Sequence, residues 1–192
     1  MREGIIFIIS GPSGGGKTTL TGKVMEALDN LRFSVSCTTR ERRKGEVDGR
    51  DYTFISESEF MDMARENKFA EYANVYGHLY GTPIDQLEMA KKTGVDLILD
   101  IDVQGARQIR DKHPSGVFCF VMPPNIEDLR KRLKARGSEE DAVIEKRISV
   151  ARQEMEGVEN YDYIINNDDL DKAVRSLKEI ILTKRHESEG VS

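Results

Sequence analysis

Four short runs of mainly apolar residues are spaced along the chain, and they predict the framework of the fold. The runs are Ile5–Ile9, Val95–Ile101, Gly116–Met122 and Tyr163–Ile165. Apolar runs of this length are typical of strands that are buried on both faces, as in parallel sheets. Stretches of helical character lie between and after them, at 17–28, 83–93, 103–113, 126–136, 139–155 and 170–187. Strands that alternate with helices predict an α/β fold, in which a parallel sheet carries helices on both faces.

The segment from about Phe33 to Thr82 interrupts this alternation. Short strands are expected in it at Phe33–Ser36, Tyr52–Ile55 and Phe69–Tyr80, the last with a turn near Gly77. Ser56 and Glu59 have the spacing of a capping box, which predicts that a helix begins after Ser56. We interpret the segment as a small α+β lobe inserted into the main domain.

The length of 192 residues suits one domain with such an insertion. We expect the core to comprise 1–32, 83–130 and 158–192, and the inserted lobe to span about 33–82. A helical lid is expected at about 131–157, where Gly137 ends one amphipathic helix and a long charged helix follows.

Charge and hydropathy narrow the range of partners. The chain has 29 Lys and Arg against 34 Asp and Glu, a formal net charge of -5, and the two signs are mixed. This balance gives no reason to expect a nucleic-acid polymer or an anionic membrane as partner. Ile5–Ile9 is too short for a signal segment, and no run approaches the ~20 apolar residues of a membrane span. We therefore expect a cytoplasmic protein, in which a local basic patch can still bind a small anion.

The cysteines and histidines point to no metal site. Cys37 and Cys119 are far apart and lack the spacing of metal ligands, and the chain has three histidines. This disfavours zinc. We expect two reduced, partly buried thiols.

A glycine-rich loop follows the first apolar run and matches the pattern G-x-x-x-x-G-K-[ST]. Its residues are Gly11, Pro12, Ser13, Gly14, Gly15, Gly16, Lys17 and Thr18. Glycines let such a loop curl around a phosphate with its N–H groups inward, and the following helix presents its positive end to the anion. Lys17 adds a charge for the β- and γ-phosphates, and the Thr18 hydroxyl can ligate Mg²⁺. The loop predicts a site for a nucleoside triphosphate.

Two carboxylates, Asp100 and Asp102, end the second apolar run. That end of a strand faces the ligand crevice in open α/β sheets, so a carboxylate there can hold Mg²⁺ or its water shell. Asp102 also begins a D-x-x-G pattern, a switch element of regulatory GTPases. A GTPase would carry N-K-x-D as well, but the only Asn-Lys pair, at 67–68, lacks the acid two residues on. The absence of the guanine-binding motif N-K-x-D argues against a GTPase.

The inserted lobe offers a second anion site, which a kinase needs for its acceptor because phosphoryl transfer is mostly positioning and charge neutralisation. Arg40 and Arg43 can grip a phosphate with bidentate geometry, and Tyr52 and Tyr80 can donate hydroxyls to it. The carboxylate of Glu71 can accept hydrogen bonds from both N1–H and N2–H₂ of guanine. Adenine would set a lone pair against that carboxylate and be strongly rejected. These residues predict guanosine monophosphate as the acceptor.

At this point the sequence closely resembles guanylate kinases, a nucleoside monophosphate kinase branch of the P-loop NTPases. The similarity extends from about Gly4 to Lys184. It is carried by the segments GPSGGGKTT at Gly11, SVSCTTR at Ser34, GEVDGRDY at Gly45, YGHLYGT at Tyr76, LDIDVQGA at Leu99 and INNDDLDKA at Ile165. The resemblance implies transfer of the γ-phosphoryl group of ATP to GMP, and to dGMP as well, with Mg²⁺ and with closure of lid and lobe.

The resemblance also implies roles for individual residues. The catalytic residues would be Lys17, Arg40, Arg132, Arg136 and Arg147, the last three as lid arginines. ATP would contact the loop from Gly11 to Thr18 together with Thr19 and Asn167. The GMP phosphate would be bound by Arg40, Arg43, Tyr52 and Tyr80. Guanine would face Ser36, Glu71, Thr82 and Asp102. The metal would lie at Thr18 and Asp100.

Two other functions fit parts of the sequence. Some scaffold proteins carry guanylate-kinase-like domains that bind proteins without catalysis, but these typically have a degraded phosphate loop. A kinase for another nucleoside monophosphate, such as AMP, is disfavoured by Glu71 and the pair Arg40 and Arg43. The residues leave open whether the chain is a monomer or a homo-oligomer.

Overall fold

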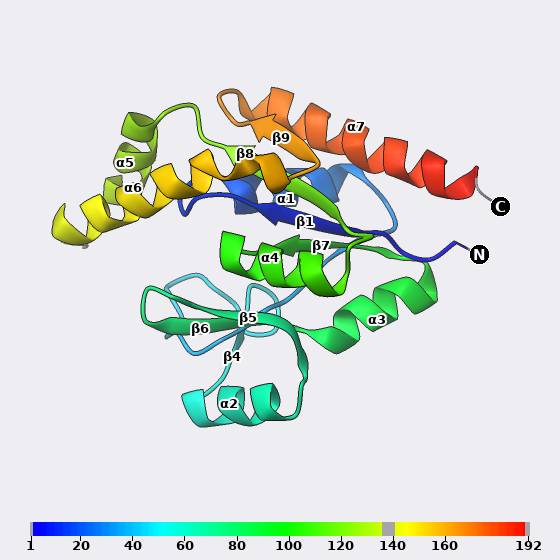
Figure 1. Ribbon diagram of the computed structural model, residues 1–192, viewed down its shortest axis with the longest axis horizontal. Helices are drawn as coiled ribbons and strands as arrows, with labels where there is room; N and C mark the ends of the chain where they lie inside the picture. The colour runs from blue at the N-terminus through cyan, green and yellow to red at the C-terminus, as the bar shows by residue number, and fades with distance from the viewer. Residues whose placement is uncertain (1, 136–140, 191–192) are drawn as a thin grey trace.

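A parallel sheet forms the centre of the molecule (Figure 1). The computed structural model describes residues 2–135 and 141–190, and within them this sheet has five strands. They are β1 (Ile6–Ser10), β2 (Leu31–Phe33), β7 (Asp96–Asp100), β8 (Val117–Met122) and β9 (Tyr163–Asn166). The order across the sheet is β2-β7-β1-β8-β9, and each adjacent pair is parallel. The predicted α/β fold with a parallel sheet is thus confirmed.

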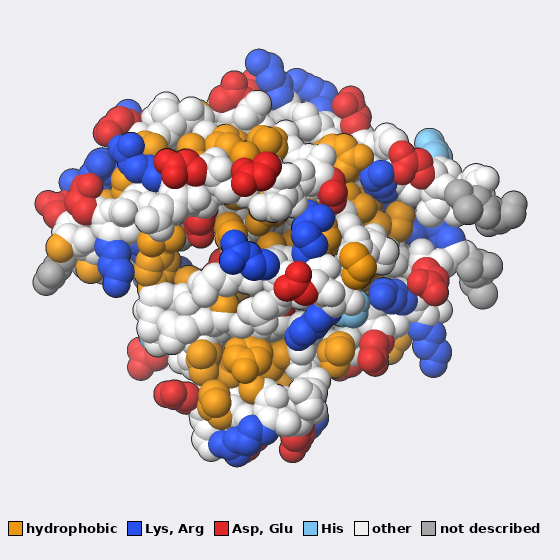
Figure 2. Space-filling model, in the orientation of Figure 1, with side chains coloured by type: hydrophobic (Ala, Val, Ile, Leu, Met, Phe, Trp, Pro, Cys, Tyr) orange, Lys and Arg blue, Asp and Glu red, His pale blue; other side chains and the backbone are white. Residues whose placement is uncertain are grey.

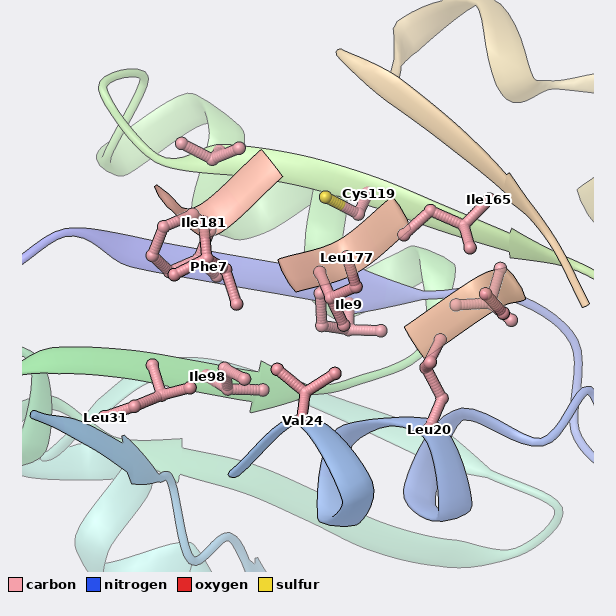
Figure 3. Packing of buried hydrophobic residues seen from close by; sticks show 13 residues of the cluster. Phe7, Ile9, Leu20, Val24, Leu31, Ile98, Cys119, Ile165, Leu177 and Ile181 are labelled. Carbon is pink, nitrogen blue, oxygen red and sulfur yellow. The ribbon is translucent and has the colours of Figure 1, made fainter. Parts of the chain in front are cut away.

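Helices cover both faces of this sheet, which explains why its strands are apolar at successive positions. Helices α1 (Lys17–Ala27) and α7 (Leu170–Glu189) cover one face, and α3 (Ile84–Thr93) and α4 (Val103–Lys112) the other. Phe7 and Ile9 of β1 belong to the first cluster, and Ile6 and Ile8 to the second. Figure 3 shows the first cluster, in which side chains of α1 and α7 meet those of the strands between them.

The edge strand β2 lies earlier in the chain than the sequence predicts. The strand expected at Phe33–Ser36 is wrong, because the strand is Leu31–Phe33 and lies in the parallel sheet beside β7. Ser34 still donates its N–H to Ile98 O, but at Val35 the chain leaves the sheet and bonds instead to the side chain of Gln86. The apparent alternation was misleading because Ser34 is itself buried.

A second sheet lies below the first in Figure 1 and belongs to what we call the lobe, residues 37–83. Its elements are β3 (Cys37–Thr38), β4 (Thr53–Phe54), α2 (Glu57–Arg65), β5 (Phe69–Val75) and β6 (His78–Pro83), with strand order β4-β3-β6-β5. Its small core contains Cys37, Phe60 and Phe69. Ser56 caps α2 and accepts a hydrogen bond from Glu59 N, as the capping pattern predicts.

Helices α5 (Ile126–Ala135) and α6 (Asp141–Glu156), which we call the lid, pack against each other at the left of Figure 1. Leu129 and Leu133 of α5 share a separate hydrophobic cluster with Ile144, Ile148 and Ala151 of α6. The expected helix end at Gly137 lies outside the described residues. The short 3-10 helix η1 (Val158–Asn160) then leads from α6 to β9.

At the start of β7, away from the phosphate loop, the buried carboxylate of Asp96 joins the two ends of the chain. It accepts hydrogen bonds from Arg2 Nη1 at 2.6 Å, Arg185 Nε at 2.7 Å and Ile5 N at 2.9 Å. These donors keep the pKa of Asp96 below its ordinary value although burial opposes this. Asp96 therefore connects the segment before β1, strand β7 and helix α7.

The surface carries charges of both signs, and both thiols are buried. Basic and acidic side chains are interspersed over the face shown in Figure 2, in keeping with the mixed charge of the sequence. Cys37 and Cys119 are free and buried, more completely than expected. Among the helices that the structure describes, none is both long and apolar enough to cross a membrane.

Candidate active site

The glycine-rich loop connects β1 to α1, and its backbone needs glycine at defined places. Gly11, Gly14 and Gly16 have φ angles of 139°, 85° and 92°, values that L side chains rarely adopt. A Cβ on Gly16 would also collide with the amide of Asn167. Gly15 N donates to Pro12 O at 2.9 Å and closes the turn. The loop therefore has the curled backbone that a phosphate requires, at the carboxyl end of β1 and the amino end of a helix.

Lys17, Thr18 and Asp100 meet at the mouth of this loop. Lys17 Nζ donates to Gly11 O at 2.7 Å and lies 4.0 Å from Asp100 Oδ1. Thr18 Oγ1 donates to Asp100 Oδ2 at 2.9 Å. β1 and β7 are adjacent parallel strands, so the loop after β1 and the acid that ends β7 reach the same edge. A hydroxyl, a carboxylate and an ammonium are thereby held within reach of one bound phosphate.

A cavity of about 440 Å³ lies beside the loop. Its lining comes from the loop, the start of α1, helix α5 and the segment from β9 into α7: Gly14, Gly16, Thr19, Arg132, Ala135, Asn167, Asp168 and Leu170. Asn167 is buried and donates from Nδ2 to Gly15 O at 2.7 Å, while Arg132 Nη1 lies 3.5 Å from the same oxygen. The structure thus places Thr19, Asn167 and Arg132, which the resemblance assigns to ATP and the lid, beside the phosphate loop.

A cluster around Arg40 lies in the lobe. Arg40 is 8% exposed, and its guanidinium donates to Tyr80 Oη at 3.1 Å and to Glu46 Oε1 at 2.7 Å. The ring of Tyr52 lies 5.8 Å from that of Tyr80 and 5.6 Å from the Arg40 guanidinium carbon. Burial raises the pKa of Tyr52 to about 12, and the charge of Asp100 contributes. Tyr52 therefore contributes an aromatic ring and a protonated hydroxyl to the cluster around Arg40.

Glu46 bridges the side chain of Arg40 and the backbone of Arg43. The Arg43 side chain is exposed, and its backbone N–H donates to Glu46 Oε2 at 2.7 Å. Glu46 thus holds Arg40 with one oxygen and the Arg43 backbone with the other. Sequence reasoning missed Glu46, although it lies in the quoted segment GEVDGRDY, because an acid beside two arginines has no anion-binding role of its own.

A second buried cluster surrounds Glu71, which is 3% exposed. Thr82 Oγ1 donates to Glu71 Oε1 at 2.6 Å. Asp102 accepts a hydrogen bond from Gly105 N at 2.8 Å as the N-cap of α4, and a Cβ on Gly105 would collide with Glu71 Oε2. The pKa of Glu71 is raised to about 7: burial is the main cause and Asp102 adds to it, whereas Thr82 and Lys112 oppose the rise. Ser36, also predicted at the guanine site, is buried between β2 and β3.

The two clusters lie on one face of the lobe sheet. Tyr80 and Thr82 are two residues apart on β6, so their side chains point to the same side, roughly 7 Å apart. Tyr80 belongs to the arginine cluster and Thr82 to the carboxylate cluster. A ligand with an anionic group and a hydrogen-bonding ring at this separation can contact both.

Two residues of α6 interact with groups outside the lid. The guanidinium carbon of Arg147 lies 4.4 Å from the ring centroid of Tyr76, in the turn between β5 and β6. Glu154 has a pKa raised to about 7, mainly by burial, with Lys17 lowering it and Asp102 raising it. Sequence reasoning missed Glu154, which is one charge in a strongly charged helix. Arg136 lies outside the described residues, so its predicted place beside Arg132 and Arg147 is not described.

The phosphate loop, the strand-end carboxylate and the parallel sheet define a P-loop nucleotide-binding protein with a second polar site in an inserted lobe. The sequence model of one family, described as guanylate kinase, matches residues 4–184. This chain belongs to the guanylate kinase family.

Individual relatives agree with this assignment. The chain is 50% identical to a guanylate kinase of Geobacter metallireducens over 96% of this chain and 91% of that protein. It is 48% identical to the one of Geobacter sulfurreducens over the same shares. The crystal structure of guanylate kinase from Anaplasma phagocytophilum aligns with a TM-score of 0.81 at 33% identity, covering 98% of this chain and 88% of that one.

Proposed function

We propose that this chain, an ATP:GMP phosphotransferase by its family, binds ATP at the phosphate loop and GMP in the lobe, with their phosphates meeting beside Asp100. The products are ADP and GDP. Asp100 contacts Thr18 at the loop, and Asp102, two residues further on, lies with Glu71 around Gly105, so the two sites adjoin there. We propose dGMP as a second acceptor, because the residues assigned below contact the phosphate and the base.

The ATP side is assigned from the loop and the cavity next to it. The N–H groups from Gly11 to Thr18 would surround the phosphates, and Lys17 would turn from its present carbonyl partners to the β- and γ-phosphates. The cavity lined by Thr19, Arg132 and Asn167 has room for the adenosine part. Asn167 also fixes the Gly15 carbonyl, which links the base pocket to the loop.

Mg²⁺ fits this donor set. Thr18 and Asp100 present a hydroxyl and a carboxylate oxygen within 2.9 Å of each other, hard donors of the kind that Mg²⁺ takes together with phosphate oxygens and water. We propose that these two residues hold it, Thr18 directly and Asp100 directly or through its waters. When bound, the ion would supply positive charge that neutralises the phosphates during transfer.

The GMP side is assigned from the two lobe clusters. Arg40, Arg43, Tyr52 and Tyr80 would bind the monophosphate, with Glu46 holding Arg40 in place. Glu71 would accept hydrogen bonds from N1–H and N2–H₂, and Ser36, Thr82 and Asp102 would complete the guanine pocket. The single observation that carries this assignment is the buried carboxylate of Glu71, whose hydrogen bond from Thr82 fixes its orientation.

The reaction needs no covalent enzyme intermediate. An oxygen of the GMP α-phosphate attacks the γ-phosphorus in line as the bond to the β-phosphate oxygen breaks. Lys17, Arg40 and the lid arginines Arg132, Arg136 and Arg147 neutralise the charge on the transferring group. We propose that lid and lobe close during turnover, which keeps water from accepting the phosphoryl group in place of GMP.

A coupled assay of ADP release tests the assignment with ATP as donor and GMP, dGMP, AMP, CMP and UMP as acceptors. GMP should be the preferred acceptor, and no turnover with GMP would overturn the proposal. A preference for AMP would move the chain to another nucleoside monophosphate kinase class. Binding of a protein ligand without turnover would favour the non-catalytic module, against which the intact phosphate loop argues.

A further inference from the structure

The edge strand of the lobe sheet is completed by side chains of a core helix. β5 pairs with β6 on one side only, and its other side faces α4, which lies directly against it in Figure 1. Gln108 Oε1 accepts a hydrogen bond from Tyr72 N at 3.3 Å, and Gln108 Nε2 donates to Tyr72 O at 2.8 Å. Lys112 Nζ donates to Ala70 O at 2.8 Å. Backbone groups that another strand would satisfy are thus satisfied by α4.

The geometry matches what a glutamine side chain can offer. Its amide has one acceptor oxygen and a donor nitrogen side by side, so it can replace one peptide group of a missing strand. Gly105, Gln108 and Lys112 fall within about 60° on one face of α4, given 3.6 residues per turn. This face of α4 therefore fits the outer edge of β5 over three consecutive residues, 70–72.

Glu71 is the residue between the two anchored positions. Its backbone is fixed on one side through Ala70 O and on the other through both polar groups of Tyr72. Its carboxylate rests against Gly105 in the first turn of α4, and Asp102 caps that same helix. The pairing of β5 with β6 also shifts register between Phe69 and Glu71, so the ladder alone fixes this residue less well. Helix α4 therefore fixes the positions of Glu71 and Asp102, the two acids of the proposed guanine site.

We propose that Gln108 and Lys112 are positioning residues for acceptor specificity: they dock the edge strand on α4 so that Glu71 meets N1–H and N2–H₂ of the guanine base together. This inference rests on the proposed role of Glu71. Two parallel hydrogen bonds to one carboxylate demand a fixed direction, and an edge strand held only by β6 can slide or twist.

A second glutamine uses the same device at the other side of the lobe. Gln86 Oε1 accepts from Val35 N at 2.9 Å, and Gln86 Nε2 donates to Val35 O at 2.9 Å. Val35 precedes Ser36, which we also assign to the guanine pocket. Helix α4 thus holds a backbone segment of the lobe, and helix α3 holds the segment that leads into it, each next to a residue that we assign to the guanine pocket.

The test compares Gln108→Leu, which keeps similar volume but loses both hydrogen bonds, with Asp111→Leu, an exposed position on the same helix. GMP and IMP are the acceptors, because IMP has the N1–H but lacks the 2-amino group. Gln108→Leu should raise KM for GMP roughly tenfold, with KM for ATP within about twofold, and should narrow the preference for GMP over IMP. Asp111→Leu should change none of these.

Lys112→Met should act in the same direction, and Lys112→Arg, which keeps a donor for Ala70 O, should restore the wild-type ratio. An equal loss with GMP and IMP, or a loss confined to thermal stability, would show that Gln108 only supports packing and would overturn the proposal.

Glu71→Gln separates this inference from the role of Glu71 itself. If Glu71→Gln keeps the GMP preference, the proposed base reading fails. If it abolishes the preference while Gln108→Leu leaves it intact, only the positioning role fails. When both are correct, Gln108→Leu should add little in the Glu71→Gln background, because the two changes remove the same interaction.

Discussion

The ammonium of Lys17 donates hydrogen bonds to carbonyl oxygens of its own loop, Gly11 O and Pro12 O. It also lies at ion-pair distance from Asp100, so its charge is held at the mouth of the loop. A bound phosphate offers better acceptors than neutral carbonyls, since charge-assisted hydrogen bonds are stronger. Lys17 can therefore exchange its carbonyl partners for a bound phosphate.

Lys17→Ala should lower kcat by roughly 10²–10³-fold, because it removes a cation that faces charge developing in the transition state. Lys23→Ala is the matched control: Lys23 lies on the same helix, is largely exposed and pairs with Asp171 at 3.7 Å. Steady-state kinetics and a thermal melt on both variants make the check. Near-normal turnover in Lys17→Ala would rule out its assigned role.

The raised pKa of Glu71, about 7, predicts a pH dependence of GMP binding. Burial is the main cause, Asp102 adds to it, and Thr82 and Lys112 oppose it. Only the ionised carboxylate can accept both guanine hydrogen bonds, so KM for GMP should fall as pH rises from 6 to 8, by up to about tenfold. In Glu71→Gln this component should vanish, leaving the titration of the GMP phosphate itself. An identical profile in both proteins would contradict the assignment.

At the scale of elements, the site lies where three units meet: the loop between β1 and α1, the lobe hairpin and the lid. The sheet that carries the loop, the lobe and the lid each have a hydrophobic cluster of their own. The lid meets the lobe hairpin through the cation–π contact of Arg147 with Tyr76, which can be exchanged at small cost during the proposed closure. The docking of β5 on α4 differs, because Gln108 bonds both polar groups of Tyr72 and Ala70 packs in the core beside them.

The contact between α6 and the hairpin turn gives a prediction at this scale. Tyr76→Leu should lower kcat about two- to fivefold, since a cation–π contact at an accessible site contributes roughly 0.5–1 kcal/mol to holding Arg147. Tyr76→Phe keeps the ring and should retain wild-type kcat. Single-turnover kinetics with ATP and GMP distinguish the two. Equal losses in both variants would show that the hydroxyl, and not the ring, matters.

At the scale of the whole molecule, Asp96 and its two arginines connect both ends of the chain to the sheet, on the edge away from the reaction. Asp96→Asn should lower the free energy of unfolding by about 3 kcal/mol, because it leaves two guanidinium groups facing a neutral partner in a buried site. Activity below the melting range should be unchanged. Chemical denaturation measures the stability and an enzyme assay the activity. An Asp96→Asn variant that keeps wild-type stability but loses activity would contradict the prediction.

The same carboxylate has a predicted pH signature. Its pKa is lower in the folded chain than in the unfolded one, so its contribution to stability is present above the unfolded pKa of about 3.9. That contribution is lost as the pH falls through the lower, folded value. The difference in stability between wild type and Asp96→Asn should therefore shrink on acidification, and a constant difference would argue against the ion pairs as its source.

Much of the fold could be predicted because its signals are local. The apolar runs became β1, β7, β8 and β9, the capping pattern at Ser56 became the start of α2, and the loop that matched a phosphate motif lies between a strand and a helix. Each of these depends on residues within a few positions of one another. β2 was misplaced because its strand character comes from pairing with β7, 65 residues away in sequence, and not from its own alternation.

The sequence alone was enough to predict the parallel α/β core, the phosphate loop and the side chains that could bind a guanine nucleotide. Hydrophobic period, glycine placement and motif spacing are properties of neighbouring residues, so no folding is needed to recognise them. The tertiary structure was needed to show that Glu46 holds Arg40, that Glu154 is partly buried on α6 with a raised pKa, and that Gln108 and Lys112 anchor the strand of Glu71. These contacts join residues on different elements, and a charged or amide side chain on a helix carries no local mark of the partner it will meet.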